Sequence, residues 1–130
     1  MKNFILLLFL VFSINTFGQV SKLRTTSFSS KTLKNNIWTQ WNELTSADIL
    51  ITVDEGKSRI VIYSNKTQIY DIAKKERKTI DQDGDVTFHF QCINQEGLNC
   101  RIRLLKMIKT EEYQLYVDFS DLKFVYNFYF

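Results

Sequence analysis

Proline is absent from the 130-residue sequence, and glycine occurs only four times. Without proline, every backbone N–H group is available to a sheet, so no residue interrupts a strand ladder. Three of the glycines, Gly56, Gly84 and Gly97, fall between runs in which apolar and polar residues alternate, which is where turns are expected. The sequence therefore favours short strands joined by tight loops.

Residues that carry chemistry are also scarce. Histidine occurs once, as His89, and the two cysteines, Cys92 and Cys100, lack the Cys-x-x-Cys spacing of a zinc site. The sequence holds no glycine-rich phosphate loop and no HExxH, GxSxG or Walker motif. Nothing near His89 in the sequence supplies a nucleophile for it to activate. We therefore expect a non-catalytic protein with no cofactor and no metal site.

Long apolar runs are confined to the start of the chain. Lys2 precedes an apolar run over residues 4–12, a more polar stretch follows, and Gly18 is a small residue suited to cleavage before Gln19. This pattern predicts a signal peptide over residues 1–18. A retained membrane anchor is the alternative, although the run is short for a bilayer span. We expect an exported protein, periplasmic or secreted, without membrane contact after cleavage.

Removing the signal peptide leaves 112 residues, 19–130, which are enough for one domain with a modest core. The formal net charge falls from +3 to +2, because Lys2 is the only charge removed, and this mild balance indicates no particular partner. Nucleic acid would be out of place as the partner of an exported chain. The start of this domain, residues 19–36, is polar and basic, and it fits either a frayed lead-in or a first edge strand.

The strongest structural signal is a hairpin over residues 86–107, with a cysteine on each arm and Gly97 in the turn. Side chains alternate along a strand, so pairing Cys92 with Cys100 brings all the apolar residues of both arms to one face. That face holds Phe88, Phe90, Cys92, Cys100, Ile102 and Leu104. Because an exported chain folds in an oxidising compartment, we expect a disulfide between Cys92 and Cys100 within this hairpin.

The other face of the same hairpin is polar. It holds His89, Gln91, Arg101 and Arg103, with His89 opposite Arg103. Two interpretations are open: a small basic patch that holds an anionic ligand, or an ordinary exposed strand face.

A three-stranded meander is predicted over residues 49–72. A two-residue loop at Gly56 and Lys57 would form a type II′ turn, which requires glycine at its first central position. This loop places Asp54 opposite Arg59 as a favourable cross-strand charge pair.

The second face of this meander is unusually apolar. A two-residue loop at 65–66 places Val61 opposite Tyr70. That face then holds Leu50, Val61, Tyr63 and Tyr70. Because apolar surface beyond the needs of a core marks binding sites, we predict these four residues as an interaction face. Burial of this face by the fold itself is the alternative.

Two segments leave their structure open. In residues 37–44 the spacing of Ile37, Trp41 and Leu44 is helical, but tryptophan and threonine favour strands, and we favour a strand. Residues 81–85 hold three aspartates and Gly84, which suggests calcium. Their spacing does not fit an EF-hand loop, and Asp-Gly between apolar alternation indicates a hairpin turn instead.

Together these signals predict an all-β fold, an antiparallel meander of about eight short strands. Such a meander can close into a small barrel, which removes its exposed edges. The function that fits best is the binding of a protein partner or a small apolar ligand, because the apolar face of the meander and the aromatic C-terminal strand both offer anchors.

Two resemblances add alternatives. Asn36-Ile37-Trp38, followed by successive hairpins, is similar to the start of lipocalins, with Asn36 at the glycine of their Gly-x-Trp motif. This resemblance implies a barrel that carries an apolar small molecule. The last strand, in which aromatic residues alternate up to Phe130, resembles the C-terminal assembly signal of outer-membrane barrels, and it implies a small barrel of that kind.

Overall fold

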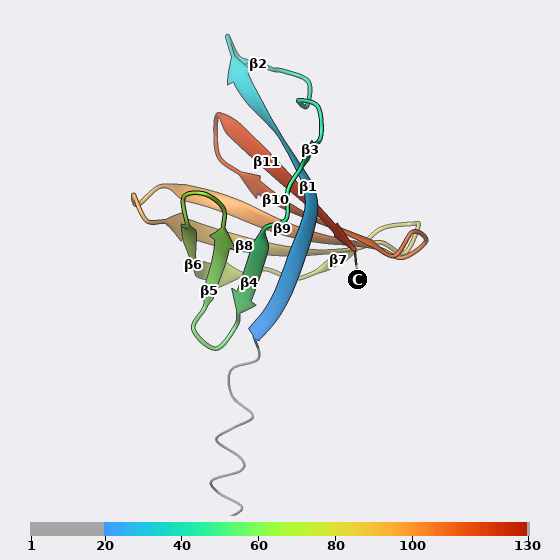
Figure 1. Cartoon of the computed structure of the whole chain (residues 1–130). Helices are drawn as coiled ribbons and strands as arrows, with labels where there is room; N and C mark the ends of the chain where they lie inside the picture. The colour runs from blue at the N-terminus through green and yellow to red at the C-terminus, as the bar shows by residue number, and fades with distance from the viewer. Residues whose placement is uncertain (1–19, 130) are drawn as a thin grey trace, which may run out of the picture.

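The computed structural model describes residues 20–129, and these residues form eleven strands and no helix (Figure 1). The strands are β1 (Val20–Lys34), β2 (Ile37–Trp38), β3 (Thr45–Ser46), β4 (Leu50–Asp54), β5 (Arg59–Tyr63), β6 (Gln68–Lys75), β7 (Thr79–Ile80), β8 (Val86–Asn94), β9 (Asn99–Met107), β10 (Glu112–Asp118) and β11 (Leu122–Tyr129). The predicted signal peptide, residues 1–18, lies outside the described residues.

Eight of these strands close into an antiparallel barrel. Successive strands pair in the order β1-β4-β5-β6-β8-β9-β10-β11, and β11 pairs back onto β1. The long strand β1 makes the seam, because residues 20–24 pair with β4 and residues 25–32 pair with β11. In Figure 1, β1 lies between β4 and β11. The prediction of an antiparallel, all-β meander is confirmed, and the meander is closed rather than open.

The barrel interior is filled with apolar side chains from every wall. Fully buried residues include Ile51, Ile60, Ile62, Ile102, Leu115 and Val117. Each of them lies on the inward face because alternate side chains of a strand point to opposite sides of the sheet. Burying one such side chain stabilises the fold by about 1.5–3 kcal/mol. The core is therefore made by the alternation that the sequence displays.

The predicted hairpin over residues 86–107 is confirmed as β8 and β9. Cys92 lies opposite Cys100, Phe90 opposite Ile102, and His89 opposite Arg103. The connection between the two strands, residues 95–98, contains Gly97, whose φ of +82° is a left-handed conformation that favours glycine. The apolar face points into the barrel, and the polar face points outward.

The disulfide expected between Cys92 and Cys100 is not formed, and both cysteines are free, buried thiols. The backbone explains the difference. The Asn94 N–H donates to the Leu98 carbonyl at 2.9 Å, and hydrogen-bonded pairs recur every second residue of an antiparallel ladder. Cys92 and Cys100 therefore form such a pair, in which Cβ atoms lie about 5.5 Å apart. A disulfide needs about 3.5–4.5 Å.

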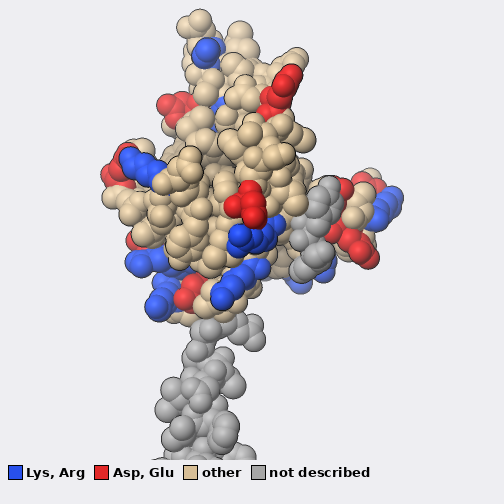
Figure 2. Space-filling model, in the orientation of Figure 1, with Lys and Arg blue, Asp and Glu red and all other residues tan. Residues whose placement is uncertain are grey.

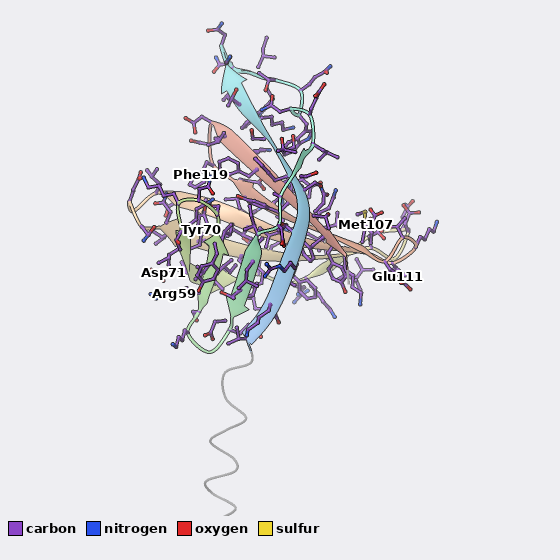
Figure 3. The ribbon with its side chains drawn as sticks, in the orientation of Figure 1. Arg59, Tyr70, Asp71, Met107, Glu111 and Phe119 are labelled. Carbon is purple, nitrogen blue, oxygen red and sulfur yellow. The ribbon has the colours of Figure 1, made fainter. Side chains whose placement is uncertain are left out.

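The turn at Gly56 differs in type from the prediction, although the register is the one expected. Asp54 lies opposite Arg59, but Ser58 and not Gly56 has a positive φ, of +50°. The loop is four residues long, with the Asp54 carboxylate accepting a hydrogen bond from the Lys57 N–H at 3.0 Å. Because Asp54 is occupied there, Arg59 forms its ion pair with another residue, Asp71 of β6, at 3.0 Å (Figure 3).

The next register was predicted wrongly by one residue. Val61 lies opposite Ile69, and Tyr70 lies opposite Ile60, and residues 64–67 form a four-residue loop in place of the two-residue turn expected. A slip of one residue sends every side chain of a strand to the other face. Tyr70 consequently points into the barrel, where it is 3% exposed.

The segment predicted as a strand over residues 37–44 is a strand only at Ile37–Trp38. The remainder crosses the outer surface of β1, β10 and β11 without regular structure. Trp41 packs on Tyr116 with a ring separation of 6.0 Å, and the Ser29 hydroxyl donates to the Asn42 carbonyl at 2.5 Å. These contacts bury Ser29 on the outside of the barrel.

Candidate functional site

One end of the barrel opens into an apolar cavity of about 470 Å³. Strands β1, β8 and β10 begin at this end, and strands β4 and β9 finish here. Its apolar lining consists of Leu23, Val53, Phe88, Phe90, Leu104 and Tyr113. We call this cavity the apolar mouth.

The lining residues reach the apolar mouth because they occupy inward positions at the ends of their strands. Phe88 lies opposite Leu104 across the β8–β9 ladder, and Leu23 lies opposite the fully buried Ile51. Val53 and Phe90 are only 6% and 3% exposed, so they form the floor of the cavity. Leu23, Phe88 and Leu104 are partly buried, and their exposed portions are what a ligand would cover.

Three polar residues complete the lining of the apolar mouth: Ser21, Lys22 and Glu55. The Glu55 carboxylate lies 2.7 Å from the Lys75 ammonium. Lys106 stands over the ring of Tyr113, with its Nζ atom 6.0 Å from the ring centre. Tyr113 in turn stacks on Phe128, with ring centres 5.4 Å apart. The walls are therefore apolar, and the charges are confined to the rim.

The opposite end of the barrel holds a second, more polar cavity of about 320 Å³. The Tyr70 hydroxyl donates to the Gln68 side chain at 2.6 Å, and the Gln68 amide donates to the Tyr126 hydroxyl at 3.3 Å. Figure 3 shows Tyr70 beside Phe119, and their ring centres are 6.4 Å apart. Burial raises the pKa of Tyr70 and of Tyr126. The side chains of Tyr70, Gln68 and Tyr126 thus hydrogen-bond to one another at this end of the barrel, which leaves few of their polar groups for a ligand.

The four residues of the predicted interaction face do not share one face. Leu50 and Val61 are half-buried on the outside of β4 and β5, and Tyr63 is 48% exposed there. Tyr70 points inward because of the register described above. The role of the outer three in an interaction stays a prediction.

The polar face of the β8–β9 hairpin is neutralised by acidic neighbours. Arg103 lies 2.6 Å from Asp118, and Arg101 lies 3.0 Å from Glu76. A hydrogen bond from Gln91, together with the positive charge of Arg101, lowers the pKa of Glu76. The two arginines are therefore engaged in ion pairs, and the ordinary strand face describes them better than a free anion site.

His89 lies on this same outward face, where its ring contacts the short strand β7. Its Nε2 atom lies 3.1 Å from the Thr79 hydroxyl. Within residues 20–129 its buried Nδ1 atom has no hydrogen-bond partner. Cys92 and Cys100 are the only thiols, and they point to the other side of the sheet, into the core. The structure thus places no nucleophilic thiol beside the imidazole.

The aspartates of residues 81–85 come together, with carboxylate oxygens within 4.8 Å of one another. Their oxygens already serve the backbone: Asp81 accepts hydrogen bonds from the Asp83 and Asp85 N–H groups at 2.9 and 3.0 Å. Asp85 accepts one from the Ile108 N–H at 3.1 Å. These bonds are those of a turn stabilised by aspartate side chains, as the Asp-Gly sequence predicts.

The apolar mouth was not found from the sequence. Phe88 and Leu104 were assigned to an apolar hairpin face, but their position at an open end depends on closure of the barrel. Leu23 belongs to a polar stretch that gave no clear strand signal. The only sequence signal that points to the mouth is the presence of large apolar residues close to the ends of the strands that surround it.

None of the described segments is a helix of the length and apolarity needed to cross a membrane. No protein-family model, curated protein or solved structure matches the chain.

Proposed function

We propose that the chain is an exported, non-catalytic carrier that binds a small apolar ligand in the apolar mouth. The observation that carries this proposal is the set of partly exposed apolar side chains, Leu23, Phe88 and Leu104, around an open cavity at one end of a closed barrel. Exposed apolar surface gathered in a concave site is the usual mark of ligand binding.

The size and chemistry of the cavity support a small ligand. Its volume of about 470 Å³ lies within the range of about 300–1,000 Å³ that is typical of small-molecule sites. Two phenylalanine rings and three aliphatic side chains supply apolar contact, and each methylene group that a ligand buries contributes about 0.8 kcal/mol. The closed barrel holds these walls in place, so little ordering is needed on binding.

Export rests on the sequence of residues 1–18, with a positive start, an apolar run and a small residue before Gln19. An extracytoplasmic carrier for an apolar molecule is consistent with such a leader, because apolar molecules outside the cell need transport through water. This part of the proposal is tested by the export experiment in the Discussion.

Two alternatives have weaker support. An outer-membrane barrel would present apolar side chains to lipid, whereas the outer face carries the Arg59–Asp71 and Arg101–Glu76 ion pairs. A protein partner on the outer meander face would use Tyr63, which is 48% exposed. The half-buried state of its neighbours Leu50 and Val61 leaves that surface small.

Fluorescence titration of the mature chain with the neutral probe N-phenyl-1-naphthylamine tests the carrier proposal. We expect saturable, one-to-one binding with enhanced fluorescence. Leu104→Trp fills the apolar mouth and should weaken binding at least tenfold. Leu105→Trp is the matched control, because residue 105 lies on the outer face of the same strand, and it should change binding less than twofold.

Far-UV circular dichroism confirms that both variants are folded before titration. If Leu104→Trp does not fold, Phe88→Ala takes its place, because it removes apolar contact from the same cavity and should also weaken binding. Absence of saturable binding to the wild-type chain, or equal effects of the residue 104 and residue 105 variants, would overturn the proposal.

A further inference from the structure

We infer that the ligand of the apolar mouth is a single-chain amphiphile with an anionic head group, which Lys106 holds at the rim. This inference rests on the carrier function proposed above. It is carried by the position of this lysine relative to the apolar walls and by the neutralisation of the only acidic residue that lines the cavity.

Lys106 belongs to the mouth by its place on β9. It follows Leu104 by two residues, so it is on the inward face of the strand, and it lies opposite Tyr113, which lines the cavity. Its ammonium stands over the Tyr113 ring at 6.0 Å. Lys22 also borders the cavity, but it directly precedes the inward Leu23, so its side chain lies on the outer face of β1. Within residues 20–129, neither ammonium has a carboxylate within ion-pair distance.

The acidic side of the rim is already neutralised. Glu55 lines the cavity, but its carboxylate forms an ion pair with Lys75 at 2.7 Å. Glu55 is therefore paired, whereas Lys106 has no ion-pair partner among residues 20–129. The opposite mouth differs, because one lysine and one glutamate, Lys66 and Glu96, both line it and its other polar groups are amides and hydroxyls.

The wider surface at this end carries charges of both signs. Figure 2 shows both basic and acidic side chains near the end of the molecule at which β1 begins, which is the end that holds the apolar mouth, so the position of Lys106 and not the wider surface carries the inference.

The two kinds of contact fit the two parts of an amphiphile. Its apolar chain would lie against Phe88, Phe90 and Leu104, where burial of methylene groups is favourable. Its anionic head would stay at the solvent edge, where a lysine can reach it without leaving water. A carboxylate there gains an unpaired ammonium partner, whereas a neutral head gains none and a cationic head is repelled.

The test compares three probes with the same twelve-carbon chain: dodecanoate, dodecanol and dodecyltrimethylammonium. Each is used below its micelle concentration, and displacement of N-phenyl-1-naphthylamine from the mature chain measures its affinity. We expect dodecanoate to bind at least tenfold more tightly than dodecanol, and the cation to bind most weakly. Raising the salt concentration from 50 to 500 mM should reduce the preference for dodecanoate, because salt screens exposed charges.

Lys106→Met keeps the apolar stem of the side chain and removes the charge. It should lower dodecanoate affinity about fivefold or more and leave dodecanol affinity within twofold. Lys34→Met is the matched control, because residue 34 is an exposed lysine at the other end of β1, and it should change neither affinity.

The outcomes separate this inference from the carrier proposal. If dodecanol binds as tightly as dodecanoate, the carrier proposal stands and the anionic head group is wrong. If neither binds, the carrier proposal itself fails. Vesicles of phosphatidylglycerol form a further arm, because an anionic head group can also belong to a bilayer. Binding to vesicles without preference for monomeric dodecanoate would overturn the inference.

Discussion

Cys92 on β8 lies directly opposite Cys100 on β9, and both are free thiols buried in the barrel core. Burial raises the pKa of Cys92 to about 12, and it raises the pKa of Cys100 to about 11. The folded protein therefore holds both sulfurs in the protonated, unreactive form at neutral pH, since the thiolate is the nucleophile.

We predict that both cysteines resist alkylation in the folded protein and react rapidly after unfolding. At pH 8, iodoacetamide should label the native chain at least about 100-fold more slowly than the chain in guanidinium, because an unfolded cysteine has a pKa of about 8.5. The native rate should rise about tenfold per pH unit as the pH approaches the raised pKa values. Mass spectrometry counts the labels. Failure of the unfolded, unreduced chain to accept two labels would show a disulfide and contradict the prediction.

The ion pair between Arg103 and Asp118 should contribute measurably to stability. Its two nitrogen–oxygen contacts are 2.6 and 3.2 Å, and the guanidinium lies 4.4 Å from the centre of the Tyr116 ring. Arg103→Met should lower the free energy of unfolding by about 1–2 kcal/mol, because a charged hydrogen bond is lost and Asp118, which is largely buried, is left unpaired. Urea denaturation measures the change.

The Arg24–Asp48 pair provides the control for this variant. Its contact of 2.7 Å is equally short, but both side chains are well exposed, at 65% and 73%. Exposed pairs of this kind contribute little, so Arg24→Met should leave the denaturation midpoint unchanged. Equal losses from the two variants would mean that burial does not decide the strength of these pairs.

The two turn glycines Gly97 and Gly56 should respond differently to alanine. Gly97 has a φ of +82°, which alanine adopts only with strain, so Gly97→Ala should destabilise the fold by about 1 kcal/mol. Gly56 is not among the glycines with positive φ, so Gly56→Ala should be neutral or slightly stabilising. Thermal denaturation of the pair of variants measures the difference, and the opposite order would contradict the backbone conformations described for these turns.

Expression of the full 130-residue chain in a Gram-negative bacterium tests export. We expect a mature product that begins at Gln19, released with the periplasmic fraction, as intact mass and N-terminal sequencing would show. A variant with Leu7→Arg and Leu8→Arg interrupts the apolar run and should remain uncleaved. Recovery of the uncleaved wild-type chain from carbonate-washed membranes would favour the anchor instead, and a mature product in the outer-membrane pellet would favour the membrane barrel.

The sequence predicts best where two independent constraints agree. The β8–β9 hairpin was placed in the correct register because its apolar alternation and its cysteines require the same pairing. The predicted disulfide was wrong, because the sequence does not show whether two opposite residues form a hydrogen-bonded pair, in which the Cβ atoms lie too far apart for a disulfide. The register of Tyr70 was wrong because four polar residues in a row, 64–67, fit a two-residue or a longer loop equally well.

Barrel closure and the apolar mouth depend on β1, which the sequence left as a lead-in or an edge strand. Its outward residues include Ser27 and Ser29, which are covered by the segment that contains Trp41 and not by an apolar layer of their own sheet. Ser29 is 3% exposed for this reason. Polar residues that are buried by a distant segment give no periodic signal, so a cavity that needs this strand could not be predicted.

The seam between β1 and β11 has a consequence for biogenesis. These two strands come before and after all the other described strands, so the contact that seals the cylinder joins positions about as far apart in the chain as any. While the chain is synthesised from its N-terminus, one edge of β1 and one edge of β10 remain unpaired until β11 is available to pair with both. At that moment the unsatisfied backbone groups of these two edges are most open to association with another copy.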